Sequence, residues 1–185
     1  AFTSSATFSA AENQTSIDTV TATDADGDSI TFTVSGSELA ITSAGVLTFV
    51  SAPDYETKSS YTATLTASDG TNSTTQSITV NVTNVNEAPV FTSPATFSGD
   101  ENQTSIGSVS VNDPEGSSIT YSLSGTDASS LAISSSGVLT FRSAPNFESK
   151  NSYSANVLAG DGTNSTTQAI TISVTDVNDA PVATA

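Results

Sequence analysis

Apolar and polar residues alternate along short stretches of this chain, with the period of two expected of strands that bury one face. Ile30, Phe32 and Val34 alternate with Thr, and the same alternation recurs elsewhere. Glycine-containing pairs such as Asp69-Gly70 separate the stretches as turn signals, and no stretch shows a helical stripe. The pattern predicts strands at residues 7–10, 20–23, 30–34, 46–49 and 61–67.

The chain contains two copies of one design. Residues Glu12–Ile17 recur as Glu101–Ile106, and Asp69–Gln76 recurs as Asp161–Gln168. Between these matches the second copy carries a three-residue insertion around Asp127, which we place in a loop. About seven short strands in about 90 residues, repeated, are typical of Greek-key sandwiches. The sequence therefore predicts an all-β chain of two tandem seven-stranded β-sandwiches of immunoglobulin-like architecture.

A short polar segment, Thr83–Phe91, joins the two copies, and Thr175–Val182 repeats its pattern near the C-terminus. Each segment leaves an alternating stretch and runs into a proline, which lacks a backbone donor and favours extended geometry in the preceding residue. We therefore predict a stiff linker, with one domain at residues 1–88 and the other at residues 89–185.

Charge and composition exclude several functions. The net charge is −16, with three basic residues, so nucleic acid and anionic lipid are unsuitable partners. There is no apolar run long enough for membrane insertion. Without His or Cys, the usual Ser and Cys nucleophile systems lack their base or nucleophile, so we predict no enzyme. The start at Ala1 without a leader indicates a segment of a longer protein.

The acidic residues gather at strand ends and junctions. A solvated acidic surface would instead mix acids with bases along exposed strand faces. Carboxylates clustered with amide and carbonyl oxygens suit Ca²⁺, which takes about six to eight oxygen ligands. Asp24-Ala-Asp26-Gly-Asp28 resembles the opening of an EF-hand loop, but its glycine is at the fourth position and Ser35 stands where the loop needs Glu.

Five short motifs recur in the same order in both copies. In the first copy they are Ala11-Glu12-Asn13, Asp24-Ala25-Asp26, Asp54-Tyr55-Glu56, Ala67-Ser68-Asp69-Gly70 and Asn84-Val85-Asn86-Glu87-Ala88-Pro89. From the first motif of the first copy to the last motif of the second, they are spread along nearly the whole chain. The motifs resemble those of the cadherin repeat, and more narrowly those of the cadherin-like repeats in large bacterial surface and secreted adhesins.

This resemblance implies two or three Ca²⁺ ions at the junction between the repeats, although Asn84 and Glu87 stand where the family has Asp. The implied junction ligands are Glu12, Asp54 and Glu56 from the first repeat, Asn84, Asn86 and Glu87 with a backbone carbonyl at Val85 or Asn86 from the linker, and Asp113, Glu115 and Asp161 from the second repeat. The implied outer half-sites are Asp24, Asp26 and Asp69 at one end, and Glu101, Glu148, Asp176, Asn178 and Asp179 at the other.

The implied function is that of a calcium-stiffened extender in a long extracellular, bacterial adhesin. Its partners would be neighbouring repeats of the same parent chain, and the segment would be a monomer. One alternative is a calcium-dependent carbohydrate-binding module, for which Tyr55 and Phe147 are the available aromatic residues. Another is homophilic adhesion or contact with a cell-surface partner, although the anchoring tryptophan of animal cadherins has no counterpart here.

Overall fold

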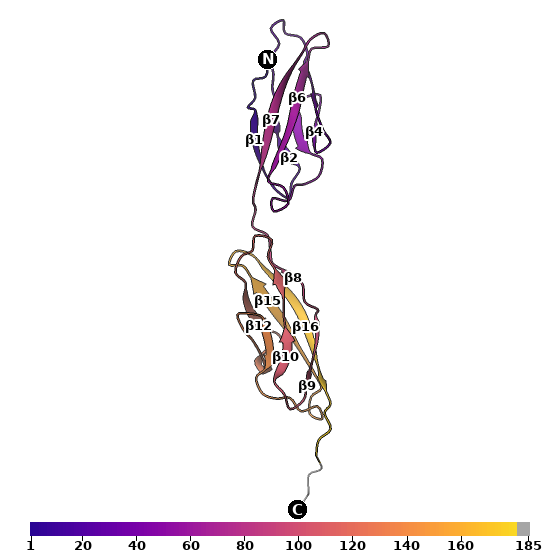
Figure 1. Cartoon of the computed structure of the whole chain (residues 1–185), viewed down its shortest axis with the longest axis vertical. Coiled ribbons are helices and arrows are strands. Elements are labelled where there is room, and N and C mark those ends of the chain that lie inside the picture. The colour runs from indigo at the N-terminus through magenta and orange to yellow at the C-terminus, as the bar shows by residue number, and fades with distance from the viewer. Residues whose placement is uncertain (181–185) are drawn as a thin grey trace, which may run out of the picture. The chain divides into compact units, whose positions relative to one another are not determined.

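The protein, described by a computed structural model over residues 1–180, divides into two compact units at Val85–Asn86. The sequence had placed the boundary after residue 88. Asn86 belongs with the second unit because its side chain donates to Asp161 and its carbonyl accepts from Asn164. Figure 1 shows strands throughout both units. No helix in the described residues is long and apolar enough to cross a membrane.

The first unit contains seven strands in two sheets. One sheet has the order β1-β7-β6-β3, with β1 parallel to β7 and the other neighbours antiparallel. The second sheet has the order β2-β5-β4 and is antiparallel. The strands are β1 (Thr7–Ala11), β2 (Ser16–Thr19), β3 (Thr31–Val34), β4 (Leu39–Ile41), β5 (Val46–Phe49), β6 (Ser60–Ser68) and β7 (Ser73–Thr83).

Side chains that alternate along these strands build the core between the two sheets, as the period of two requires. Leu65 and Val80 from one sheet and Leu47 from the other are fully buried. The Tyr61 ring packs edge-on against Phe49, with 5.0 Å between the ring centroids. The all-β sandwich predicted from the alternation is therefore confirmed.

The second unit repeats this architecture, with sheets β12-β15-β16-β9 and β10-β14-β13. A further pair, β8 with β11, corresponds to the isolated bridge between Phe2 and Ala22 in the first unit. This pair accounts for the strands beyond seven in the described part of the unit. The strands are β8 (Val90–Phe91), β9 (Thr96–Asp100), β10 (Ser105–Ser108), β11 (Val111–Asn112), β12 (Thr120–Ser124), β13 (Leu131–Ile133), β14 (Val138–Phe141), β15 (Ser152–Gly160) and β16 (Ser165–Thr175).

The strand predicted at residues 20–23 is wrong. The strand in this region is β2, which ends at Thr19, and the chain then leaves the β2-β5-β4 sheet. The N–H of Val20 donates to the Gly45 carbonyl at 2.8 Å, and Ala22 forms only the single bridge to Phe2. Val20 is 1% exposed, so its apolar character reflects core packing outside a regular strand.

The turn glycine before β5 is required by its surroundings. Gly45 has φ +89°, and a Cβ atom there would lie 2.2 Å from the Val20 carbonyl oxygen. Gly137 repeats both features, with φ +81° and 2.3 Å to the Val109 carbonyl oxygen. Only glycine satisfies the backbone angle and the close approach together.

The insertion of the second copy forms a short 3₁₀ helix, η1 (Ala128–Ser130). Asp127 precedes it and is 8% exposed. Its carboxylate accepts hydrogen bonds from the Lys150 ammonium group and from the backbone N–H of Ser154. These contacts hold the pKa of Asp127 below its ordinary value of 3.8, with the Lys150 hydrogen bond as the largest cause.

Candidate metal centres at the ends of the two units

A buried carboxylate organises the C-terminal end of the first unit. Glu12 follows β1 and is 3% exposed. Its Oε2 accepts the backbone N–H of Tyr55 at 2.7 Å, and its Oε1 accepts that of Val85 at 2.8 Å. One side chain thus ties the loop before β6 to the residues that leave β7, because the parallel pairing of β1 with β7 brings Glu12 beside Thr83.

The loop before β6 adds further oxygens at the same end. Glu56 and Glu12 carry carboxylate oxygens within 4.8 Å of each other, and Glu56 Oε1 accepts the Asn84 side-chain amide at 2.9 Å. Asp54 accepts the N–H and the hydroxyl of Thr57, both at 3.0 Å. The structure therefore brings the predicted ligands Glu12, Glu56 and Asn84 together and places Asp54 in the same loop, next to Tyr55.

The N-terminal end of the second unit carries the other predicted ligands. Asn86 donates from its side-chain amide to Asp161 Oδ2 at 2.9 Å, and the N–H of Glu87 donates to Glu115 Oε2 at 3.3 Å. The pKa of Asp161 is lowered, mainly by the Asn86 side-chain bond and then by the N–H groups of Asn164 and Thr163. The donors around Asp161 therefore favour the charged form of its carboxylate.

Two oxygens at this end have no partner in the described structure. Asp113 is 8% exposed, and its Oδ1 accepts the Ser117 N–H at 2.9 Å while its Oδ2 accepts nothing. Glu115 Oε1 is likewise buried and unpartnered. Buried carboxylate oxygens without donors are costly, and a bound cation is one way to satisfy them. The residues present therefore fit a hard, oxygen-preferring ion such as Ca²⁺.

The sequence analysis missed Asn164 at this end. Its side-chain amide donates to the Asn86 carbonyl at 2.8 Å, and its N–H donates to Asp161 Oδ1 at 2.7 Å. Asn164 therefore fixes both a predicted ligand carbonyl and a predicted ligand carboxylate. The signal was available, because the asparagine lies in the octapeptide that is identical in the two copies.

The C-terminal end of the second unit repeats the arrangement built around Glu12. Glu101 is 1% exposed and accepts the N–H groups of Phe147 at 3.0 Å and Val177 at 2.9 Å. These two bonds, in that order, lower the pKa of Glu101. Carboxylate oxygens of Glu101, Glu148 and Asp179 lie within 4.8 Å of one another.

The remaining predicted members of this half-site are more loosely placed. Asp176 and Asn178 are exposed. The Asn178 amide donates to the carbonyl of Asp179 at 3.4 Å, and Asn102 donates to the Asp179 carboxylate at 3.2 Å. The three-carboxylate group is therefore the compact part of the predicted half-site.

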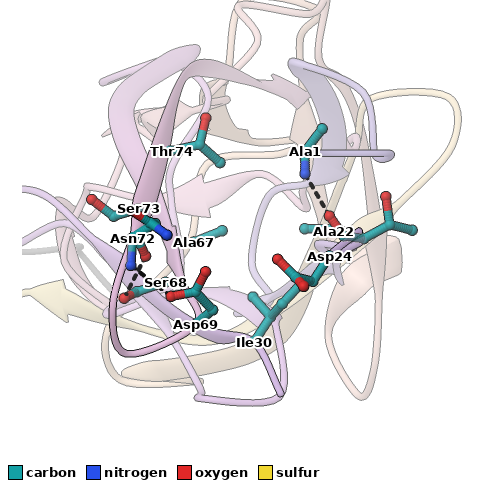
Figure 2. Close-up of a pocket in the computed structure, with 11 residues that line it drawn as sticks. Ala1, Ala22, Asp24, Ile30, Ala67, Ser68, Asp69, Asn72, Ser73 and Thr74 are labelled. Carbon is teal, nitrogen blue, oxygen red and sulfur yellow. Dashed lines mark hydrogen bonds between the residues drawn. The ribbon is translucent and has the colours of Figure 1, made fainter. Parts of the chain in front are cut away.

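The N-terminal end of the first unit brings Asp24 and Asp69 to one pocket of about 150 Å³, with Ala22 and Ile30 among its apolar lining (Figure 2). Asp24 Oδ1 accepts the N–H of Asp26 at 2.9 Å. Hydrogen bonds from the N–H groups of Asn72 and then Thr71 lower the pKa of Asp69. Asp26 itself is exposed and does not line the pocket.

Parts of the chain are similar in sequence to known bacterial proteins. The bacterial Ig domain family matches residues 86–175, which are nearly all of the described second unit. Chitinase A of Pseudoalteromonas piscicida is 36% identical over 107 residues, which are 56% of this chain. The match spans only 13% of that protein.

Similar solved structures are ectodomain fragments. Human protocadherin-24 EC1-2 has a TM-score of 0.66 and 23% identity, covering 92% of this chain and 94% of that one. Mouse cadherin-23 EC22-24 has a TM-score of 0.63 and 24% identity, covering 92% of this chain and 62% of that one. Protocadherin gammaB7 EC3-6 has a TM-score of 0.61 and 26% identity, covering 97% of this chain and 51% of that one.

Proposed function

Since the chain is a tandem pair of bacterial cadherin-like repeats, we propose that it serves as a calcium-stiffened extender in a long extracellular bacterial protein of the adhesin type. The repeats supply length, and Ca²⁺ bound where they join supplies stiffness. Binding and positioning, without catalysis, are the proposed roles of both repeats. The chain spans 13% of the chitinase it matches, in keeping with a segment of something longer.

The unpartnered Oδ2 of buried Asp113 is the observation that carries this proposal. The carboxylate needs a positive partner, and Glu115 Oε1 has the same need. The chain passes directly from Val85, which is bonded to Glu12, into Asn86, which is bonded to Asp161. Two or three ions that took oxygens from both ends of this short connection would restrain its backbone far more than Pro89 alone.

Charge repulsion gives the proposed ions their energetic role. Two carboxylates within 4.8 Å, such as Glu12 and Glu56, repel by roughly 1–3 kcal/mol in a partly solvated setting. Seven of the proposed junction ligands are acids, so the repulsion accumulates without cations. Calcium should therefore stabilise the fold around the junction as well as stiffen it.

Small-angle scattering of the whole chain tests the stiffening. We expect a narrow distribution of molecular lengths in millimolar calcium and a broad one in excess EDTA. Asp113→Asn should broaden the calcium distribution, whereas Asp18→Asn, an exposed acid on β2, should leave it narrow. The same distribution in calcium and in EDTA would refute the stiffening, and calorimetry should count two or three tightly bound ions.

The likeness to Chitinase A supports a second candidate, an accessory module of a secreted polysaccharide-processing enzyme. Tyr55 is 37% exposed, but Phe147 packs against the core of the second unit, so only Tyr55 of the expected aromatic pair offers a sugar platform. Retention on insoluble chitin in calcium would favour this role. Self-adhesion is the third candidate, and a monomer in sedimentation at high concentration would exclude it.

A further inference from the structure

The three basic side chains of this acidic protein line two grooves. Lys58 lines a groove of about 360 Å³ in the first unit, and Arg142 and Lys150 line one of about 300 Å³ in the second. The grooves occupy the same place in the two repeats, since Tyr61 lines the first groove and its matched residue Tyr153 lines the second. Placement of every base in equivalent grooves on a chain of charge −16 calls for a physical explanation.

In both units, the lysine that lines the groove also makes stabilising contacts within its own unit. The ammonium group of Lys58 lies 4.3 Å from the centroid of the Tyr61 ring, and that of Lys150 lies 4.6 Å from the Tyr153 ring. Lys58 also pairs with Glu38 at 2.5 Å, and Lys150 pairs with Asp127. Each lysine therefore contributes cation–π and ion-pair contacts to its own repeat.

The two grooves differ in charge. The groove of the first unit is lined by the acids Glu38 and Asp54 as well as Lys58. In the second unit Ser130 and Asn146 occupy the corresponding positions, and no acid lines the groove. Arg142 takes the place of Val50, because the N–H of each donates to the matched carbonyl across the groove, that of Ser130 and that of Glu38. The second groove is thus basic where the first is acidic.

Arg142 is held so that its outer nitrogens remain available. Its backbone N–H donates to the Ser130 carbonyl at 2.9 Å, and its Nε donates to the Leu131 carbonyl at 2.8 Å. Among residues 1–180, no carboxylate pairs with its guanidinium group. A guanidinium fork fixed at Nε and open at both Nη groups suits an oxyanion that presents two neighbouring acceptor oxygens, to which it can donate two parallel hydrogen bonds.

The rest of the groove lining favours a saccharide over a peptide as the bearer of that oxyanion. Phe141 and Pro145 line the groove but are buried, and Lys150 covers one face of the Tyr153 ring, so the groove offers little apolar anchorage for a peptide side chain. Hydroxyl and amide groups are instead the common lining chemistry, and they can bond sugar hydroxyls. They belong to Ser129, Ser130, Ser143, Asn146 and Ser149.

We propose that the groove of the second unit binds an anionic saccharide, with Arg142 holding a carboxylate or sulfate group and the serine and asparagine side chains bonding the ring hydroxyls. The overall negative charge does not prevent this, because charges beyond about 8 Å are largely screened at physiological ionic strength. Arg142, Lys150 and the Lys150-bound Asp127 then dominate the local field. This site would add a ligand-binding function to the proposed extender.

Titration calorimetry with the whole chain in calcium tests the proposal. The probes are a galacturonate tetramer for carboxylates, a sulfated galactan tetramer for sulfates, and chitotetraose as the neutral control. We expect one of the acidic probes to bind one site per chain, with affinity that falls as salt is raised, and chitotetraose to bind at least tenfold more weakly. Binding of neither acidic probe, or equal binding of chitotetraose, would overturn the proposal.

The first unit supplies matched variants. Arg142→Val places its counterpart residue in the basic groove and should weaken binding at least tenfold, whereas Val50→Met should change nothing. The double variant Glu38→Ser with Val50→Arg should create a second site in the first unit. A fold check by thermal melting accompanies each variant, and unchanged binding in a folded Arg142→Val chain would also overturn the proposal.

Discussion

The carboxylate of Glu12 accepts the backbone N–H of Val85 at 2.8 Å, which joins the end of the first strand to the last residue of the first unit. Glu101 holds Val177 in the same way at 2.9 Å. In each repeat a buried acid therefore binds the backbone of the polar segment that leaves the last strand. The acid proposed as a metal ligand also holds the strand ends in place.

Replacement of Glu101 should destabilise the second unit. Glu101→Ala leaves the N–H groups of Phe147 and Val177 without their acceptor. Hydrogen bonds to charged groups contribute about 1.5–3 kcal/mol each, so we expect a loss of about 3 kcal/mol in the free energy of unfolding of the second unit. Urea denaturation in EDTA measures this loss without any contribution from calcium.

Glu148→Ala is the matched control for that variant. Glu148 is exposed and lies in the same carboxylate group as Glu101 and Asp179. Its removal should leave stability in EDTA within about 0.5 kcal/mol of the parent, or raise it slightly because repulsion falls. Equal losses for the two variants would show that Glu101 has no special structural role.

The ion pair of Asp127 with Lys150 should make the second unit sensitive to acid. The folded pKa of Asp127 is lowered, so its contribution is fully present above the ordinary value of 3.8 and is lost as the pH falls through the lower folded pKa. Asp127→Asn should cost about 1 kcal/mol at pH 7. The difference between parent and variant should shrink as the pH falls below 3.8 and through the lower folded pKa of Asp127. Urea denaturation across this range would show a constant difference if the mechanism were wrong.

Much of the fold could be predicted from the sequence because its signals are local. Alternation identified the sandwich, and duplication fixed the number of domains. The segment at residues 20–23 was misassigned because Val20 is buried without belonging to a regular strand, and burial alone gives the same apolar signal. Strand periodicity does not distinguish the two cases.

The site was less predictable than the fold. Resemblance to a family located the acids, and the structure shows Glu12, Glu56 and Asn84 within one unit at one end. The second contact of Glu12, with Tyr55, depends on a backbone N–H, which carries no side-chain signal in the sequence. Asn164 was overlooked because its role depends on the path of the linker carbonyl that it bonds.

Gly137→Ala should be among the most destabilising single-methyl changes in the second unit. The added Cβ would lie 2.3 Å from the Val109 carbonyl oxygen in a backbone with φ +81°. We expect a loss of at least about 2 kcal/mol, from strain and displacement of that carbonyl together. Gly162→Ala has a positive φ of +101° but open space around it, so its smaller loss in the same thermal or urea measurement would separate the clash from the backbone angle.

Asn84→Asp should lower the stability of the protein without calcium and raise its affinity for calcium. Asn84 now donates its side-chain amide to Glu56 Oε1, and the aspartate would replace that donor with a second negative charge. We expect a loss of about 1 kcal/mol in EDTA from the missing bond and the new repulsion. Calcium would gain one more anionic oxygen, so calorimetry should show tighter binding, and the thermal shift on adding calcium should exceed that of the parent. Asn81→Asp, an exposed change on β7, should raise neither quantity, and equal gains in both variants would point to general charge attraction instead of a ligand at residue 84.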